Sequence, residues 1–129
     1  MDVRGLAEFY RKLLGFSYRP GDEPADNAPD SAHKDWLVLQ DATGAAKVAF
    51  QQVAVLPEPT WPEGPHPQML HLDLAVDTVA ELETQNARAM SFGARLLRDR
   101  INDPEEPLLV YADPAGHPFC IFVKAAGEG

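Results

Sequence analysis

The sequence predicts an α+β fold of two βαβββ modules that form a curved mixed sheet around a cavity, with the helices outside. Two observations predict it. The turn Asp41–Gly44 recurs as Asp113–Gly116, 72 residues later (113 − 41), and each turn lies between two apolar strands. Each half also has a helical segment that ends at a glycine, Gly15 or Gly93, and continues into a strand. The leading strand of the first module is missing from the sequence, so either translation begins upstream or one sheet edge is open.

The first module spans residues 1–56 and begins with a helix capped by Asp2 and running to about Leu14, with an apolar stripe of period 3.6. A short strand at 16–19 follows, and then an acidic, proline-rich loop at 20–32 that reads as a surface insertion. Strands at 36–40 and 47–53 then form the first hairpin.

A connector at residues 57–67 separates the modules. It contains five prolines, together with Trp61 and His66. Proline lacks a backbone N–H and fixes φ, so this segment is extended and is neither a helix nor a central strand. Trp61 and His66 either flank the mouth of the cavity or pack over the edge of the core.

The second module spans residues 68–124 and opens with a strand at 69–77. Leu70, Leu72, Leu74 and Val76 alternate along it and predict an apolar face toward the helices, which places His71 and Asp73 on the other face. A helix from Thr78 to about Phe92 follows. Its predicted inward residues are Val79, Leu82, Ala89 and Met90. Strands at 95–100, 108–112 and 119–123 complete the module.

Composition narrows the possible partners. A net charge of −9 and a pI near 4.7 argue against nucleic acid and anionic membranes, which would repel the chain. One cysteine, Cys120, excludes an internal disulfide and fits a reducing cytoplasm. The sequence shows neither a signal-peptide pattern nor an apolar run of about 20 residues, the length that spans a bilayer. These features predict a cytoplasmic protein.

The order of elements, the segment His71-Leu-Asp-Leu-Ala-Val-Asp77 and the segment Asp113-Pro-Ala-Gly-His-Pro-Phe-Cys120 resemble the glyoxalase/bleomycin-resistance/dioxygenase superfamily, also called vicinal oxygen chelate proteins. The resemblance covers nearly all of the chain and is greatest for its glyoxalase-like branch. In metal-dependent members it implies an ion held by one residue from the first strand and one carboxylate from the last strand of each module.

That ligand set is incomplete here. His71 matches the first-strand position of the second module, and Cys120 stands where the carboxylate is expected. In the first module the equivalent of Cys120 is Val48 or Gln51, depending on the alignment of the two hairpins, and neither is a carboxylate. Divalent ions need several converging ligands. The sequence therefore favours a metal-free site, while a divalent metal held by His71 stays an alternative.

Each candidate residue has a functional and a structural interpretation. His71 is a general base, a metal ligand or a hydrogen-bonded wall residue, and Asp73 either orients it or is a solvated edge charge. Gln51, Tyr111 and Cys120 either line a ligand cavity or have structural roles, Cys120 as a small buried residue.

Two functions follow from these interpretations. The first is a binding protein for a small organic ligand, for which a cationic ligand fits the negative charge. The alternative is a lyase, isomerase or dioxygenase that uses His71. The open sheet edge also predicts a homodimer.

Overall fold

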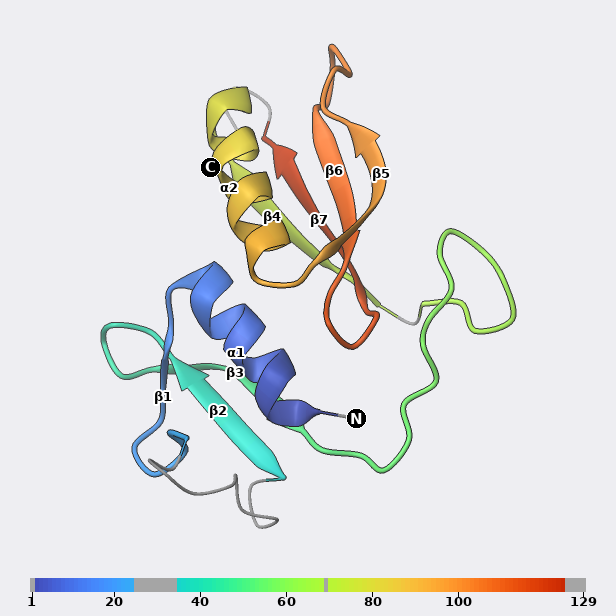
Figure 1. Cartoon of the computed structure of the whole chain (residues 1–129). Helices are drawn as coiled ribbons and strands as arrows, with labels where there is room; N and C mark the ends of the chain where they lie inside the picture. The colour runs from blue at the N-terminus through green and yellow to red at the C-terminus, as the bar shows by residue number, and fades with distance from the viewer. Residues whose placement is uncertain (1, 25–34, 69, 125–129) are drawn as a thin grey trace. The chain divides into compact units, whose positions relative to one another are not determined.

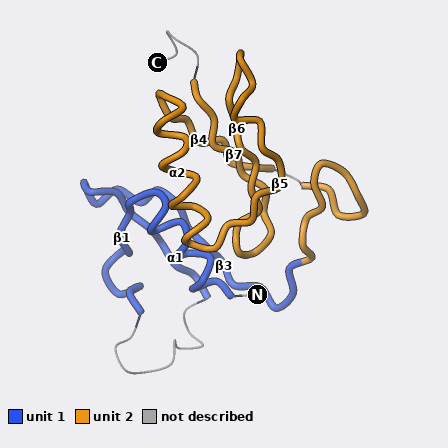
Figure 2. Tube along the Cα trace, turned by 45° about the horizontal axis from the view of Figure 1, so that its top comes forward, with its two compact units in different colours: residues 1–56 blue, residues 57–129 orange. Residues whose placement is uncertain are grey.

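The chain divides into two compact units, one of residues 1–56 and one of residues 57–129 (Figure 2). The computed structural model describes residues 2–24, 35–68 and 70–124. Within each unit, one helix packs against one face of a β-sheet (Figure 1), so the predicted α+β class is confirmed. Most of the acidic loop predicted at 20–32 lies outside the described residues.

The first unit holds one helix and an antiparallel sheet in the order β1-β2-β3. Its elements are α1 Val3–Leu14, β1 Ser17–Tyr18, β2 Trp36–Gln40 and β3 Ala46–Gln51. Helix α1 begins and ends as predicted. The carboxylate of Asp2 accepts the N–H of Gly5 at 2.9 Å, and Gly15 ends the helix with a φ of +72°, a conformation that favours glycine.

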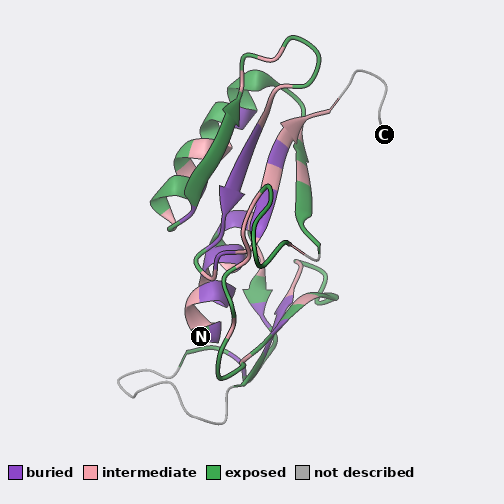
Figure 3. Cartoon of the chain, turned by 90° about the vertical axis from the view of Figure 1, so that its right-hand side faces the viewer, coloured by how far each residue is buried: buried purple, intermediate pink, exposed green. Residues whose placement is uncertain are grey.

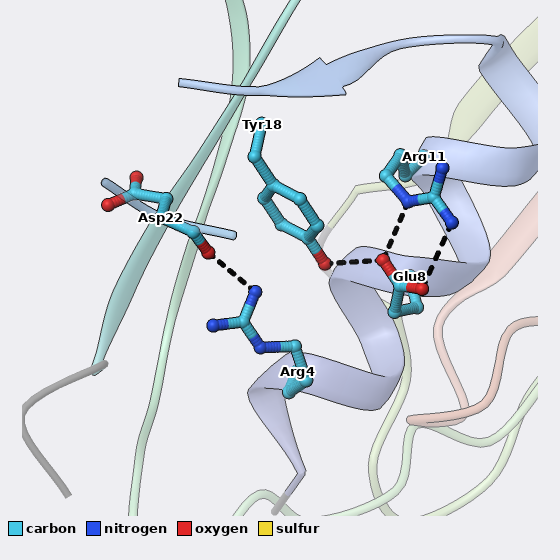
Figure 4. A network of polar contacts seen from close by, with 5 residues as sticks. All are labelled: Arg4, Glu8, Arg11, Tyr18 and Asp22. Atoms are coloured by element: carbon cyan, nitrogen blue, oxygen red, sulfur yellow. Dashed lines mark hydrogen bonds and ion pairs between the residues drawn. The ribbon is translucent and has the colours of Figure 1, made fainter. Parts of the chain in front are cut away.

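Polar contacts hold α1 against the strand that follows it (Figure 4). The Tyr18 hydroxyl donates to Glu8 at 2.7 Å, and the Arg11 guanidinium donates to the same carboxylate at 2.6 and 3.0 Å. Arg4 lies 4.9 Å from the centre of the Tyr18 ring and donates to the carbonyl of Asp22 at 2.6 Å. Burial and the Glu8 hydrogen bond raise the pKa of Tyr18 to about 12. These groups satisfy one another, so we interpret the network as structural.

The second unit holds a mixed four-stranded sheet in the order β4-β7-β6-β5, in which β4 runs parallel to β7 and the other pairs are antiparallel. Its elements are β4 Leu72–Val76, α2 Val79–Ser91, β5 Arg95–Arg100, β6 Leu108–Ala112 and β7 Pro118–Val123. Residues on β6 are mostly buried, whereas β5 is exposed along its whole length (Figure 3).

Helix α2 begins where the sequence predicts it, with Thr78 as the residue that caps its first turn. The Thr78 hydroxyl accepts the N–H of Glu81 at 3.1 Å, and the Glu81 carboxylate accepts the N–H of Asp77 at 2.8 Å. Leu82 and Ala89 are fully buried, as expected.

Two inward residues of α2 were predicted wrongly. Val79 is 40% exposed and Met90 is 43% exposed. Val79 lies in the first turn of the helix, and Met90 is rotated about 100° around the axis from the buried Ala89. The apolar stripe that contacts the sheet is therefore narrower than the pattern of apolar residues predicted.

The strand that carries the His71 motif is shorter and more exposed than predicted. Strand β4 begins at Leu72, so His71 lies just before it, and Met69 is outside the described residues. Leu70 is 75% exposed and Leu72 is 41% exposed, although both were placed on the face toward the helices. The physical reason is position, because β4 is an edge strand and only β7 flanks it within the described part of the unit.

Candidate functional site

Three polar side chains of the second unit converge at the start of β4. The Nε2 atom of His71 lies 3.2 Å from an Asp73 carboxylate oxygen. Asp73 is in register with Cys120 on the neighbouring strand β7. One ligand atom from each of His71, Asp73 and Cys120 lies within 4.8 Å of the other two. We call these three residues the polar cluster.

The polar cluster lies on the side of the sheet away from α2, which we call the distal face. Residues paired across adjacent strands share a face. Asp73 pairs with Cys120, Cys120 pairs with Val110, and Val110 pairs with Arg98 on β5. One row of four residues therefore crosses the whole distal face, with a carboxylate at one end and a guanidinium at the other.

The row carries charged side chains only at its two ends, Asp73 and Arg98. Val110 is buried, and Phe122, two residues beyond Cys120, is half-buried on the same face. The apolar strip between the ends consists of Leu108, Val110, Ala112, Pro118 and Phe122. Val110, Ala112 and Pro118 are buried, so the accessible apolar surface of the strip comes from the half-buried Leu108 and Phe122, with polar groups at both ends of the row.

A β-bulge gives β5 its arrangement of side chains. The pairing of β5 with β6 shifts between Leu96 and Arg98, so Leu97 is the additional residue. Strict alternation from Arg95 would put Arg98 on the helix face. With the bulge, Arg95, Arg98 and Arg100 all pair with distal-face residues of β6.

The thiol of Cys120 is held in its neutral form. Burial raises the pKa of Cys120 to about 11, and the hydrogen bond and negative charge of Asp73 and the charge of Glu106 act in the same direction. At neutral pH the group is therefore a thiol, a poor nucleophile that can donate a hydrogen bond. A nucleophilic role for Cys120 does not fit this environment.

Two hollows of the second unit adjoin the distal face. The first, of about 330 Å³, lies where the sheet meets the loop at 101–107. Its lining residues are Arg100, Asp103, Glu105, Glu106, Leu108, Phe122 and Val123. The second, of about 370 Å³, lies between the connector and the sheet. Its lining residues are Glu58, Pro59, Thr60, Trp61, Glu63, Arg95, Leu97, Ala112 and Gly116.

The sequence left two roles open for Tyr111, a cavity residue or a structural residue. Its contacts are those of a structural residue. Its ring stacks on Phe119 with centroids 5.0 Å apart, and its hydroxyl donates to Asn86 of α2 at 2.8 Å. Tyr111 is fully buried, and burial raises its pKa, with the charge of Asp99 adding to the shift. It lies on the helix face, opposite the polar cluster.

The other predicted ligand residues lie in different places. Gln51 is exposed on β3 in the first unit, next to Trp36 across the hairpin. Trp61 lines the connector hollow and stacks on Arg98, whose guanidinium carbon is 4.9 Å from the ring centre. His66 is exposed, and its backbone N–H and carbonyl bond to Thr60. Of the predicted set, only His71, Asp73 and Cys120 come together.

Sequence reasoning missed Arg98 as a site residue. The alternation of β5 places Arg98 on the helix face unless a bulge is assumed, and no residue type in Arg95–Arg100 marks one. The sequence contained one indication of the bulge. An arginine at position 98 does not fit the apolar pattern expected of a strand face toward a helix.

The polar cluster offers chemically suitable donors for a divalent ion. An imidazole nitrogen, a carboxylate oxygen and a sulfur are the donor types that zinc takes, and three protein ligands leave one coordination position open. The resemblance to metal-dependent members of the superfamily indicated one clear ligand, His71. The structure brings two further donors, from Asp73 and Cys120, close to it. Cys120 would ligate as the thiolate, which costs free energy to form in this environment.

No helix within the described residues is both long enough and apolar enough to span a membrane.

Comparison with known proteins gives the family. The sequence profile described as "Glyoxalase-like domain" matches residues 1–122. No curated protein matches the chain. Among solved structures, a glyoxalase-related enzyme from Fulvimarina pelagi is 22% identical with a TM-score of 0.58, and the match covers 95% of this chain and 81% of that one.

Two further solved structures have the same fold. A glyoxalase/bleomycin resistance protein/dioxygenase family enzyme from Burkholderia phytofirmans is 19% identical with a TM-score of 0.62, over 95% of this chain and 90% of that one. A fosfomycin resistance protein from Listeria monocytogenes is 12% identical with a TM-score of 0.64, over 97% and 86%. The profile match over almost the whole sequence shows that the chain belongs to the glyoxalase-like domain family, within the vicinal oxygen chelate superfamily.

Proposed function

We propose that the chain binds a small organic molecule on the distal face of the second unit, without a resident metal ion. The observation that supports this proposal is the row from Asp73 to Arg98, in which polar groups stand on both sides of an apolar strip. Ligand sites are mostly apolar with a few placed polar groups, and the distal face has that composition.

The polar cluster gives the proposed ligand its orientation. His71 and Asp73 are both exposed, so their outer atoms are available to a ligand. The Asp73 carboxylate accepts a hydrogen bond from the Cys120 thiol, and its remaining lone pairs can accept hydrogen bonds from a ligand. A ligand with a cationic or hydrogen-donating group at this end would offset part of the negative charge that Asp73 and Glu106 place here.

A second candidate function is metal-dependent catalysis by a lyase, isomerase or dioxygenase. The observation that favours it is the convergence of His71, Asp73 and Cys120 within 4.8 Å. A bound divalent ion would polarise a substrate oxygen or lower the pKa of a bound water. A fosfomycin resistance protein from Listeria monocytogenes, 14% identical, has been crystallised as a variant with Mn(II). In this second function His71 and Asp73 would be ligands of the ion, whereas in the first His71 orients the organic ligand and Asp73 holds the imidazole.

Elemental analysis of the purified protein separates the two candidates. We expect no stoichiometric divalent ion in the parent protein. Calorimetric titration with benzylammonium, a small cationic aromatic probe whose ammonium group has three N–H donors, should then show binding. That binding should weaken at least tenfold in His71→Ala, because a lost hydrogen bond from the charged ammonium to the imidazole is worth roughly 1.5–3 kcal/mol.

His66→Ala is the matched control. It removes an imidazole from the same unit, but His66 bonds through its backbone and lies on the connector. An ion present at one equivalent in the parent and in His66→Ala, and lost in His71→Ala, would replace the binding proposal with the metal-dependent one. A probe that binds the parent and His71→Ala equally would remove the polar cluster from either function.

We also propose that the protein is a homodimer. Strand β3 pairs with β2 along one edge, and no described strand pairs with its other edge. An unpaired strand edge exposes N–H and C=O groups that can pair with a second chain.

A further inference from the structure

We propose that Arg98 anchors an oxyanion group, a carboxylate or a phosphate, of the small molecule bound on the distal face. This inference rests on the proposed function and gives its ligand a chemical class. The ligand would carry the oxyanion at the β5 end of the row and its donor group at the polar cluster.

The bulge at Leu97 is the reason that Arg98 reaches the distal face at all. With strict alternation from Arg95, Leu97 would pair with Val110 on the distal face, and Arg98 would pair with Leu109 on the helix side. The structure puts Asp99 in register with Leu109 instead, and the charge of Asp99 acts on Tyr111 on the helix side. Bulges next to functional sites characteristically re-aim a side chain. Here the bulge puts a guanidinium, in place of the Leu97 side chain, in the row that contains Cys120.

The three distal-face arginines differ in their partners. Arg95 forms a short ion pair with Glu58, and Arg100 pairs with Asp103 at 2.7 Å. Among the residues that the structure describes, no carboxylate lies within 4 Å of the Arg98 guanidinium. Its contact is the ring of Trp61, 4.9 Å away. Arg98 is therefore the arginine of this face whose charge is not neutralised by a neighbouring acid.

Stacking against Trp61 suits the capture of an oxyanion. An indole ring that lies over the guanidinium plane limits its rotation without using its in-plane N–H donors. Those donors match the two oxygens of a carboxylate or the oxygens of a phosphate, and the resulting charge-assisted hydrogen bonds are short and strong. Trp61 also lines the connector hollow of about 370 Å³, so there is room for a ligand beside it.

The row has the dimensions of a small metabolite. Three strand spacings of about 4.8 Å separate Asp73 from Arg98, which gives roughly 14 Å between their backbones. The buried Val110 and the half-buried Cys120 lie between them in the row. A ligand with an oxyanion at one end and a donor group at the other would fill this span.

Trp61 itself reports on the Arg98 site. The chain has two tryptophans, so Trp36→Phe in the first unit leaves Trp61 as the single emitter. In that background we expect sodium phosphate to change the Trp61 emission with a saturable curve, while sodium chloride at equal ionic strength does not. Sodium acetate in a parallel titration tells whether the site prefers a carboxylate. Arg98→Gln should weaken the phosphate response at least tenfold.

Arg88→Gln is the matched control. Arg88 also lies over an aromatic ring, that of Phe92 at 5.5 Å, but it belongs to α2 rather than to the distal face. It removes the same charge and the same type of contact, so the phosphate response should persist. Equal phosphate curves for the parent and Arg98→Gln would overturn the proposal, and so would a chloride curve that matches the phosphate curve.

The test also separates this inference from the proposed function. In the Trp36→Phe background, His71→Ala should leave the phosphate response intact, because His71 lies at the other end of the row. If benzylammonium fails to bind while phosphate binds through Arg98, the anchor stands and the proposed ligand at the polar cluster is wrong. If the probe binds through His71 and phosphate does not bind, the anchor alone is wrong.

Discussion

Asp73 determines the chemistry of both other members of the polar cluster. Its carboxylate lies 3.2 Å from the His71 imidazole, and its charge and hydrogen bond add to burial in raising the pKa of Cys120 to about 11. One acid therefore contacts the imidazole and adds to the burial that keeps the neighbouring thiol protonated. This arrangement favours binding through hydrogen bonds over covalent chemistry at sulfur.

A second histidine–carboxylate pair, remote from the polar cluster, makes stability depend on pH. The Nδ1 atom of His117 lies 3.0 Å from Asp113, whose carboxylate also accepts the N–H groups of Ala115 and His117. Hydrogen bonding to Asp113 raises the pKa of His117 above its ordinary value near 6.5, and the charge of Asp113 adds to this effect. A raised pKa means that the folded state binds the proton more tightly than the unfolded state.

That pair leads to a prediction about His117→Asn. The stabilisation by protonated His117 is fully present below about pH 6.5 and is lost as the pH rises through the folded-state pKa. The variant should therefore lose more stability at pH 5.5 than at pH 8.5. The difference should be about 0.5–1 kcal/mol, because the side chain is 40% exposed and solvent screens the pair.

Chemical denaturation at both pH values measures this difference, with His66→Asn as the control on the exposed connector. An equal loss at the two pH values would show that the pair carries no charge-dependent stability. A larger loss at pH 8.5 would contradict the direction of the pKa shift.

At the scale of secondary structure, Tyr111 joins α2 to β6. Its hydroxyl donates to Asn86, and its ring stacks on Phe119 in the fully buried layer under the helix. Tyr111→Phe keeps the stacking and removes the hydrogen bond. We expect a loss of about 1 kcal/mol in the free energy of unfolding, the usual net worth of such a bond.

The same variant should leave ligand binding unchanged. Tyr111 faces the helix, so the phosphate response of Trp61 should be the same in Tyr111→Phe as in the parent. Asn86→Ala, alone and combined with Tyr111→Phe, completes a double-mutant cycle in which the two losses should not add. A change in the phosphate response without a change in stability would place the hydroxyl on the distal face.

The bulge on β5 explains what sequence could and could not predict about these elements. The bounds of β2, β5 and β6 and both helix caps follow from local signals, namely alternation, capping residues and glycines, and the structure confirms them. A bulge depends on the register between two strands, which no local pattern encodes. For this reason the alternation of residues in β5 did not predict that Arg98 lies on the distal face.

The exposure of the leucines on the edge strand β4 could not be predicted from the sequence for a related reason. The alternation of Leu70 and Leu72 predicts an apolar face, but whether that face is covered depends on how many strands flank β4. The convergence of Asp73 with Cys120 likewise needed the parallel pairing of β4 with β7, which joins residues 47 positions apart (120 − 73). The residue type alone indicates the chemistry of His71, whereas the strand topology determines that Cys120 lies close to His71 and Asp73.

At the scale of the whole molecule, the repeat appears as two units of related topology. Strands β1, β2 and β3 of the first unit correspond in order to β5, β6 and β7 of the second. In the second unit β7 is flanked on both sides, by β4 and by β6. Strand β3 corresponds to β7, and among the described strands it has β2 as its single neighbour. The position that β4 fills in the second unit is thus the edge proposed for pairing with a second chain.

Backbone geometry gives a specific test of this edge. The N–H of Gln52 donates to the carbonyl of Asp35 at 2.7 Å, so it points toward β2. Because N–H directions alternate along a strand, the N–H of Ala49 points away from β2. Proline at position 49 would remove a donor from the open edge without removing a bond to β2, and proline is tolerated at such edge positions.

We therefore expect the parent protein to be a dimer at micromolar concentration and Ala49→Pro to be a monomer that keeps its helix and strand content. Size-exclusion chromatography with light scattering measures the mass, and circular dichroism measures the secondary structure. Ala49→Ser keeps the backbone donor and should stay dimeric. A monomeric parent would refute the dimer, and a dimeric, folded Ala49→Pro would move its interface away from β3, because the pairing of strand edges needs the N–H donors that proline lacks.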